Sequence, residues 1–139
     1  MFSRIAESIR AAFVAPTVDV SAHCDLPCGV YDPAQARIEA ESVKACQEKY
    51  QASDDPVFKA RAVQIKEERA ELVKHHLWVL WTDYFKPDHL AKFPKLHELF
   101  WAATKEAGLA KKSLDPAQGQ KLVDQIKEID TIFWETKKG

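Results

Sequence analysis

The stretch DPVFKARAVQIKEERAELVKHHLWVLWTDY (residues 55–84) decides the fold, because it reads as one long helix. The Asp55-Pro56 pair is a start signal, since the carboxylate caps the first turn and the proline ring fixes φ at a helical value. After this pair, residues expected on one face of the helix recur at alternating spacings of four and three. This spacing is typical of the packed face of a helix in an antiparallel bundle, and we call these residues the stripe. The predicted stripe consists of Phe58, Ala62, Ile65, Arg69, Leu72, His76 and Val79.

Other helix starts flank this stretch. Asp32-Pro33 and Asp115-Pro116 repeat the start signal, and a further helix is predicted after Pro87 or Pro94, with Gly108 just past its end. No alternating strand pattern competes. We therefore predict an all-α fold, an up-down-up-down four-helix bundle over about residues 33–136. The predicted buried positions of these three helices are Ala36, Ala40, Val43 and Tyr50, then Phe93, Leu96, Phe100, Ala103 and Ala107, then Leu122, Ile126, Ile129 and Phe133.

Composition narrows the class of protein. The chain has 139 residues, of which 46% are hydrophobic and 29% charged, with a formal net charge of −1. This balance fits one globular domain. Near-neutral charge argues against the basic surface that nucleic-acid binding needs, and no apolar run reaches the roughly 18 residues of a membrane span. We therefore expect no nucleic-acid partner, no membrane partner and a cytoplasmic location.

The first 22 residues differ from the rest. Ile5, Ile9 and Phe13 share one face of a short amphipathic helix that would end at Pro16. The uninterrupted apolar run, residues 11–15, is shorter than the roughly 7–15 residues of a secretory signal core, so export is not expected. Two interpretations remain, a frayed N-terminal arm or a pro-segment (residues 1–22) that is removed ahead of the rest.

The predicted helices lack the usual signatures of a bundle metal site. The Glu-x-x-His pairs of di-iron bundles, the His-Glu-x-x-His motif and Gly-rich phosphate loops are all absent from the sequence. The helical histidines are therefore predicted to be surface or interface side chains, and the helical cysteine to be an inert buried thiol. These residues are His75, His76, His89, His97 and Cys46.

Arg69 is unusual because it interrupts the predicted apolar stripe. A guanidinium in that position needs a carboxylate or carbonyl acceptor. The sequence leaves two interpretations open: a structural ion pair with Glu39 or Glu68, or a role in orienting a group of a functional site.

The densest group of metal-binding side chains is HCDLPCGVY (residues 23–31), which places His23, Cys24 and Cys28 within six residues. The Cys-x3-Cys pair by itself fits a redox pair, a zinc half-site or a disulfide, although the further ligands that zinc needs are missing. A cut before His23 would add a free amine. That amine, the Cys24 amide nitrogen and two thiolates can close a square plane, with the imidazole as a fifth ligand. Such a plane points to Ni(II) or Cu(II), and thiolates disfavour Cu(II) because they reduce it.

The segment HCDLPCGVYDP resembles the N-terminal nickel hook of the nickel-containing superoxide dismutase family. Residues 34–44, 65–84 and 129–138 also resemble that family, so the likeness covers nearly all of residues 23–139. It implies a protease that removes residues 1–22, one nickel ion per subunit, and a homohexamer of four-helix bundles. It further implies that one superoxide reduces Ni(III) and leaves as O2, and a second oxidises Ni(II) and leaves as hydrogen peroxide.

The same resemblance implies roles for individual residues. His23, Cys24 and Cys28 would bind nickel, with backbone groups of Asp25 and Cys28 near its open face. Tyr31 and Tyr84 would stand at the substrate approach. The Glu39 and Arg69 pair would steady the His23 imidazole.

Two other functions stay open at this point. One is a bundle that binds nickel or copper without catalysis, and the other is a thiol-redox protein that uses Cys24 and Cys28. The thiol-redox function predicts that the metal is dispensable.

The free amine leads to a first prediction. In the full-length chain the nitrogen of His23 is an amide, so we expect weak nickel binding, whereas a chain beginning at His23 binds nickel tightly. Calorimetric titration of both chains with Ni(II) measures the difference. Equal affinity in the two chains would contradict the role given to the amine.

Overall fold

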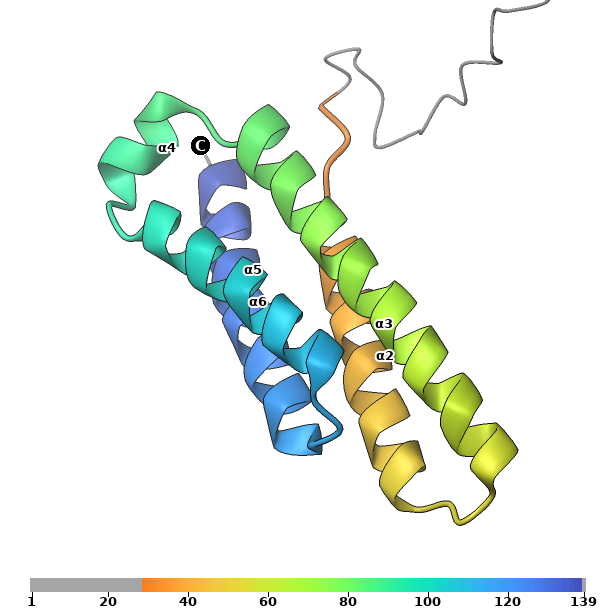
Figure 1. The fold of residues 1–139 in the computed structure, drawn as a ribbon. Coiled ribbons are helices and arrows are strands. Elements are labelled where there is room, and N and C mark those ends of the chain that lie inside the picture. Colours follow the sequence, from red (N-terminus) through yellow and green to blue (C-terminus); the bar gives the residue numbers. More distant parts are fainter. Residues whose placement is uncertain (1–28, 139) are drawn as a thin grey trace, which may run out of the picture.

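The computed structural model describes residues 29–138, and every regular element in that range is helical (Figure 1). The all-α prediction is confirmed. Within the described range no helix combines the length and apolarity needed to cross a membrane. The elements are α2 (Ala34–Gln51), α3 (Pro56–Val79), the π-helix η1 (Leu80–Tyr84), α4 (Pro87–Lys92), α5 (Leu96–Lys112) and α6 (Pro116–Lys137).

Two of the three Asp-Pro pairs begin helices as predicted, and the third lies directly ahead of α2, with Pro33 as the N-cap. Asp55 and Asp115 are N-caps whose carboxylates accept hydrogen bonds from the backbone N–H of Val57 and Ala117, both at 2.9 Å. Asp32 accepts from the backbone N–H at the start of α2 at 2.8 Å. Each carboxylate therefore satisfies a backbone donor that the first turn leaves without a helical partner.

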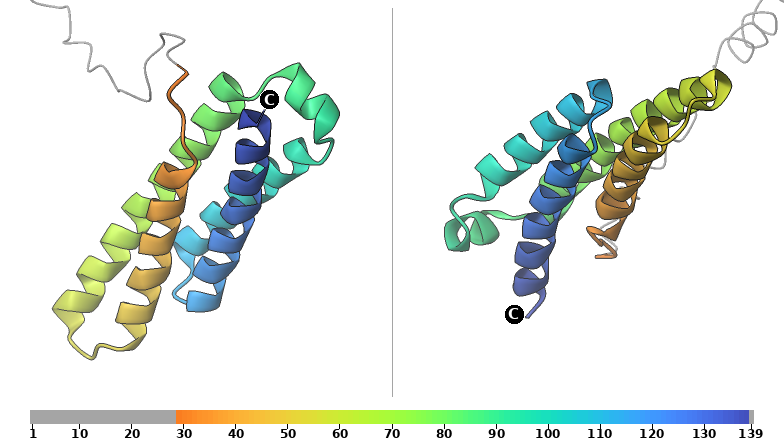
Figure 2. Two further views of the ribbon diagram at one scale, coloured as in Figure 1. Left: turned by 180° about the vertical axis from the view of Figure 1, so that it is seen from behind. Right: turned by 90° about the horizontal axis from the view of Figure 1, so that it is seen from below.

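The four long helices form a ring of neighbours. α2 packs along α3 and α6, and α5 packs along α6 and α3. Consecutive long helices point in opposite directions (Figure 1). In both Figure 1 and Figure 2, the start of the described chain, the end of α3, α4 and the C-terminal end of α6 all lie at one end of the molecule. Segments far apart in sequence therefore meet at that end.

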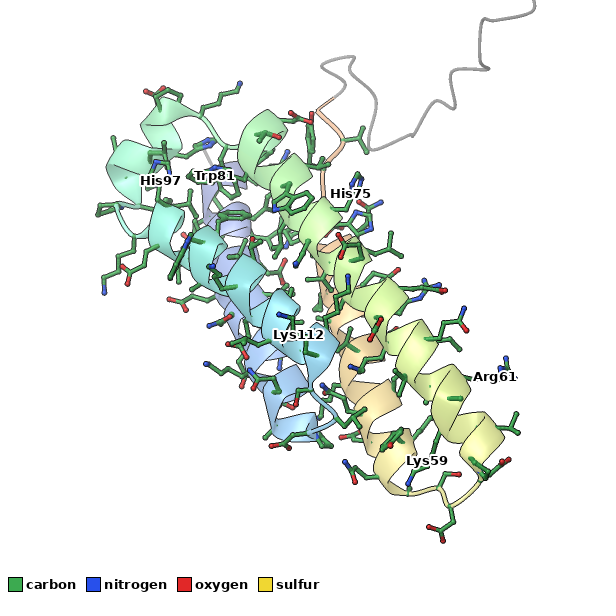
Figure 3. The ribbon with its side chains drawn as sticks, viewed as in Figure 1. Lys59, Arg61, His75, Trp81, His97 and Lys112 are labelled. Atoms are coloured by element: carbon green, nitrogen blue, oxygen red, sulfur yellow. The ribbon has the colours of Figure 1, made fainter. Side chains whose placement is uncertain are left out.

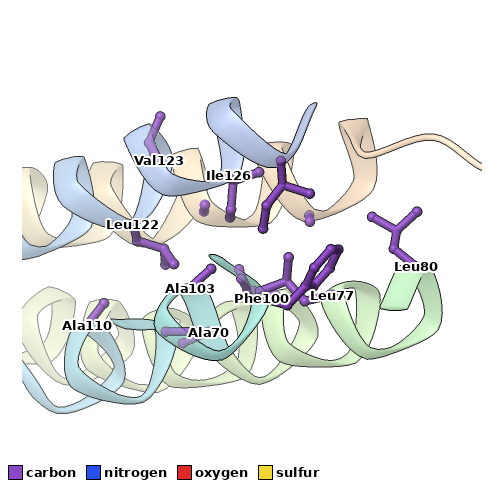
Figure 4. Close-up of a cluster of buried hydrophobic side chains, with 14 of the residues drawn as sticks. Ala70, Leu77, Leu80, Phe100, Ala103, Ala110, Leu122, Val123 and Ile126 are labelled. Atoms are coloured by element: carbon purple, nitrogen blue, oxygen red, sulfur yellow. The ribbon is translucent and has the colours of Figure 1, made fainter. Parts of the chain in front are cut away.

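The core follows the predicted faces of α5 and α6. Leu96, Phe100, Ile126 and Phe133 are buried, and Figure 4 shows the side chains of several core residues turned inward between the helices. Alanines let the helices approach closely, because they add little volume at the contact. The other predicted members confirmed as buried are Ala36, Ala40, Val43, Ala103, Ala107, Leu122 and Ile129, whereas Tyr50 and Phe93 are only half-buried.

The predicted stripe of α3 was wrong. The buried residues lie about one position further along the chain, so a different face of the helix is buried. The buried residues are Ala62, Lys66, Ala70, Val73 and Leu77, followed by Leu80. Of the predicted stripe only Ala62 is buried. Phe58 and Ile65 are 40% and 38% exposed, and Arg69, Leu72, His76 and Val79 are half-buried. The predicted stripe did not include Lys66, a charged residue that belongs to the buried face of α3.

Lys66 is buried because its ammonium caps the end of α5. Its Nζ donates to the carbonyl of Ala110 at 3.4 Å and to the carbonyl of Lys111. Burial lowers the pKa of this lysine. Gln47 joins the cluster, donating from Nε2 to the carbonyls of Ala110 at 3.3 Å and Ser113 at 3.1 Å. These donors satisfy the last carbonyls of α5, so the helix runs on past Gly108 to Lys112, and the predicted glycine stop was wrong.

Gly119 lies where α6 packs tightly against α2, which yields a second prediction. A Cβ there would lie 2.8 Å from the Cα of Lys44 and also against Gln47 Oε1. We expect Gly119→Ala to lower the free energy of unfolding by about 1–3 kcal/mol, because backbone must move to make room.

Gly108→Ala is the matched control for that change. Its added Cβ would meet only the end of the Lys74 side chain, at 3.5 Å from Nζ. Alanine should hold or raise stability there, by up to about 1 kcal/mol, because it is the better helix former. Urea unfolding of both variants makes the comparison, and coincident unfolding curves would contradict the close approach.

Candidate functional site

The structure describes four of the seven predicted site residues, namely Tyr31, Glu39, Arg69 and Tyr84. The three predicted metal ligands, His23, Cys24 and Cys28, lie outside the described residues, as does Asp25. The described part of the site consists of side chains near the start of the described chain and of the Glu39–Arg69 pair.

Tyr31 and Tyr84 are brought together. Their ring centroids lie 5.5 Å apart, with the ring planes inclined at 54°. Tyr31 stands just ahead of α2, after Gly29, whose φ of 72° is the left-handed conformation that glycine adopts most easily. Tyr84 ends η1, where the backbone N–H of Phe85 bonds to the carbonyl of Leu80 at 3.1 Å. A single π-turn of this kind often marks a functional site.

A cleft of about 410 Å³ opens beside the two tyrosines. Three segments line it: the first described residues, the link from η1 into α4, and the last turn of α6. Two lysines and one aspartate give its wall a positive balance, which favours small anions. The lining residues are Gly29, Tyr31, Asp83, Tyr84, Lys86, His89, Thr136 and Lys137.

Several contacts hold the Tyr84 side chain in this cleft. Its ring lies 4.4 Å from that of Phe133 and is stacked on His89 at 5.6 Å, measured between centroids. Its hydroxyl is 2.6 Å from Thr136 Oγ1. The Lys137 Nζ lies 5.0 Å from the centre of the Tyr84 ring, a cation–π distance. Packing and hydrogen bonding thus fix the ring on all of these sides.

Sequence reasoning missed Thr136 and Lys137 as cleft residues. A usable signal was present, because they follow the predicted buried residue Phe133 by three and four positions and so share its side of the helix. Lys86 and His89 gave no comparable signal. They reach the cleft because Pro87 begins the short helix α4 there, and the backbone N–H of Lys86 donates to His89 Nδ1 at 3.2 Å.

Arg69 pairs with Glu39, as one of the two interpretations predicted. Its Nη1 lies 3.3 Å from each carboxylate oxygen of Glu39. The side chain of Glu39 is 16% exposed and that of Arg69 is 38% exposed. The pair lines a separate groove of about 340 Å³ between α2 and α3, which shares no lining residue with the tyrosine cleft.

The described residues offer no metal site of their own. Within residues 29–138, no group of three or more histidine, cysteine, aspartate or glutamate side chains is placed to hold a metal ion. Figure 3 shows His75 on α3 and His97 on α5, where His97 packs against the Trp81 ring at 4.3 Å between centroids. Ahead of Gly29, and so outside the described residues, the sequence has a histidine and two cysteines within six residues.

The chain is similar to proteins of known function. The sequence model of the family described as nickel-containing superoxide dismutase matches residues 18–137. A superoxide dismutase [Ni] of Streptomyces coelicolor is 67% identical over 124 residues, which cover 89% of this chain and 95% of that protein.

Solved structures give the same result. A native nickel superoxide dismutase aligns with a TM-score of 0.82 at 66% identity, covering 84% of this chain and all of that chain. A variant of such an enzyme, with the histidine at its first position replaced by alanine, aligns with a TM-score of 0.76 at 64% identity, over 78% of this chain and 99% of its own.

Cys46 provides the third prediction. It is a half-buried free thiol on α2, and burial raises its pKa. Less thiolate is present near neutral pH, so alkylation should be slower than for an unperturbed cysteine. A chain carrying Cys24→Ser and Cys28→Ser isolates this thiol. Its reaction with iodoacetamide should speed up on unfolding in urea, and equal rates in the folded and unfolded chain would contradict the burial effect.

Proposed function

The chain belongs to the nickel-containing superoxide dismutase family, and we propose that residues 23–31 form its metal-binding hook in front of an up-down-up-down four-helix bundle. The activity is the conversion of two superoxide ions and two protons into O2 and hydrogen peroxide, with nickel as cofactor. Neither the non-catalytic metal-binding protein nor the thiol-redox protein is favoured by these comparisons.

The proposed hook requires processing before His23 by a protease. The alignment with a solved relative covers all of that relative but only 84% of this chain. The unmatched 16% of this chain is close in length to residues 1–22. A related enzyme has a histidine at its first position. Both observations support a mature chain that begins at His23, with residues 1–22 as the pro-segment.

The donor set fits nickel. His23 would contribute its amine and imidazole, Cys24 its amide nitrogen and thiolate, and Cys28 its thiolate. When bound there, nickel supplies the alternation between Ni(III) and Ni(II) that takes an electron from one superoxide and gives it to the next. The described residues 29–138 offer no competing ligand group, which supports placing the metal on these three residues.

The cleft beside Tyr31 and Tyr84 is the proposed substrate approach. Gly29 and Tyr31, which belong to the last residues of the proposed hook, line this cleft. Superoxide is a small anion, and Lys86 and Lys137 would attract it. The two rings would narrow the passage, which keeps larger molecules from the oxidation-prone thiolates.

Glu39 and Arg69 are proposed to orient the imidazole of His23. An ion pair whose arginine is open to solvent contributes only about 0–1 kcal/mol to stability, so stability alone explains poorly why Arg69 lies there. A carboxylate that accepts a hydrogen bond from a ligating imidazole fixes its orientation. Six Cα–Cα steps join His23 to Gly29 and reach at most about 22 Å when fully extended, and the proposed role requires the pair to lie within that reach.

Assembly and location are further parts of the proposal. Trp78, Trp101 and Leu109 are 48%, 65% and 52% exposed, and exposed apolar side chains of this size support subunit contacts. We propose a homohexamer with one nickel ion per subunit, located in the cytoplasm.

The fourth prediction tests the function. A chain beginning at His23 and loaded with Ni(II) should remove superoxide in a pulse-radiolysis assay. Cys24→Ser and Cys28→Ser should abolish both nickel content and activity. Nickel-loaded protein without activity would refute the catalytic proposal, and activity retained by both serine variants would refute nickel–thiolate binding.

The same assay tests the Glu39–Arg69 pair. Arg69→Met should lower activity about 10–100-fold, the usual size of such orienting effects. Arg37→Met is the matched control, because Arg37 forms an exposed ion pair with Glu41 at 3.4 Å elsewhere on α2. Similar activity of the two methionine variants would contradict the orienting role.

A further inference from the structure

The hydroxyl of Tyr84 belongs to a chain of two short hydrogen bonds. It lies 2.6 Å from Thr136 Oγ1, and Thr136 Oγ1 in turn lies 2.5 Å from the backbone carbonyl of Phe133. Distances of this size are those of well-formed O–H···O hydrogen bonds. All three groups lie at the last turns of α6 and the end of η1.

The direction of this chain follows from counting protons. A carbonyl oxygen can only accept, so Thr136 must give its single hydroxyl proton to Phe133. Thr136 then has only lone pairs left for Tyr84. The bond between the two hydroxyls therefore runs from Tyr84 to Thr136, and the phenolic proton of Tyr84 points toward α6.

We propose that Thr136 is a positioning residue, because it accepts the hydroxyl proton of Tyr84 and keeps that proton directed toward α6. The Tyr84 oxygen can then accept hydrogen bonds from molecules in the cleft but cannot donate one. This inference rests on the proposed function, in which the cleft is the superoxide approach. Tyr84 is then unsuited to hold a small anion or to give a proton to reduced substrate. The carbonyl of Phe133 ends the chain and carries no proton, so no relay through Thr136 can resupply Tyr84.

This arrangement would attract anions to the cleft without holding them there. Lys137 and Lys86 draw anions toward the cleft by charge, while the acceptor-only oxygen of Tyr84 gives them no hydrogen bond once inside. Hydrogen peroxide, which can donate, meets a suitable partner there. The two protons of the reaction must accordingly enter by a path other than the Tyr84 hydroxyl.

The fifth prediction tests the direction of this bond by NMR. In the full-length chain labelled with 13Cζ-tyrosine in mixed H2O and D2O, a slowly exchanging hydroxyl gives a resolved isotope doublet. We expect a doublet for Tyr84, assigned with Tyr84→Phe, in the wild type and in Thr136→Ser. Thr136→Val, which has the same shape but cannot accept, should show one averaged line.

Kinetics of the nickel-loaded enzyme starting at His23 give the second readout. In Thr136→Val the freed Tyr84 proton can donate into the cleft, so azide should inhibit about tenfold more strongly, the effect of one hydrogen bond to a charged group. Thr136→Ser keeps the hydroxyl that accepts from Tyr84, so its inhibition by azide should match that of the wild type. Thr131→Val is the matched control, because Thr131 bonds to the Lys127 carbonyl at 3.0 Å on the exposed side of the same helix.

The outcomes separate this inference from the proposed function. An averaged Tyr84 line in the wild type, or unchanged azide inhibition in a folded Thr136→Val, would overturn the positioning role. Loss of the doublet in Thr136→Ser would also overturn it, since serine keeps the acceptor. Absence of dismutase activity in the wild type would overturn the proposed function, whereas the NMR doublet tests the bond direction independently of nickel.

Discussion

The burial of the Lys66 ammonium at the end of α5 is the interaction on which the rest of the structure depends. An ammonium removed from water must have acceptors, and the last carbonyls of α5 are acceptors without helical partners. Their pairing fixes the rotation of α3 about its own axis. That rotation turns Arg69 toward Glu39 on α2. Gln47 and Gly119 complete the constraint, because they set how closely α2 can approach α5 and α6.

Local chemistry explains which parts of the fold were predictable. The start signals at Asp55 and Asp115 depend on the residue and its next two neighbours, so they can be read from sequence. The stripes of α5 and α6 consist of apolar residues on one face, which periodicity detects. The stripe of α3 could not be placed in this way, because a lysine belongs to it. Its acceptors lie 44 and 45 residues away in sequence, and only the folded chain brings them near.

The candidate site also contains features that could be predicted and features that could not. The pairing of Tyr31 with Tyr84 was expected only from the resemblance of the chain to a family, because the two residues belong to different elements. For Arg69 the sequence itself required an acceptor and left Glu39 and Glu68 open, and the resemblance pointed to Glu39. The structure confirms both contacts. Thr136 and Lys137 were not anticipated, since their importance arises only where the end of α6 meets the end of η1. The predicted metal ligands lie ahead of Gly29, so their roles continue to rest on sequence and family.

The π-turn at Leu80–Tyr84 has a consequence for how this site could have arisen and how it could be lost. A π-turn is one residue longer than the α-turn it replaces, so it amounts to an insertion within a helix. Everything after it is rotated and advanced relative to α3. The orientation of Tyr84 thus depends on the length of the chain as well as on residue identity. A relative with the same side chains but one residue fewer in this turn would present a different face to the cleft, and alignments that ignore single gaps here would equate residues that do not correspond.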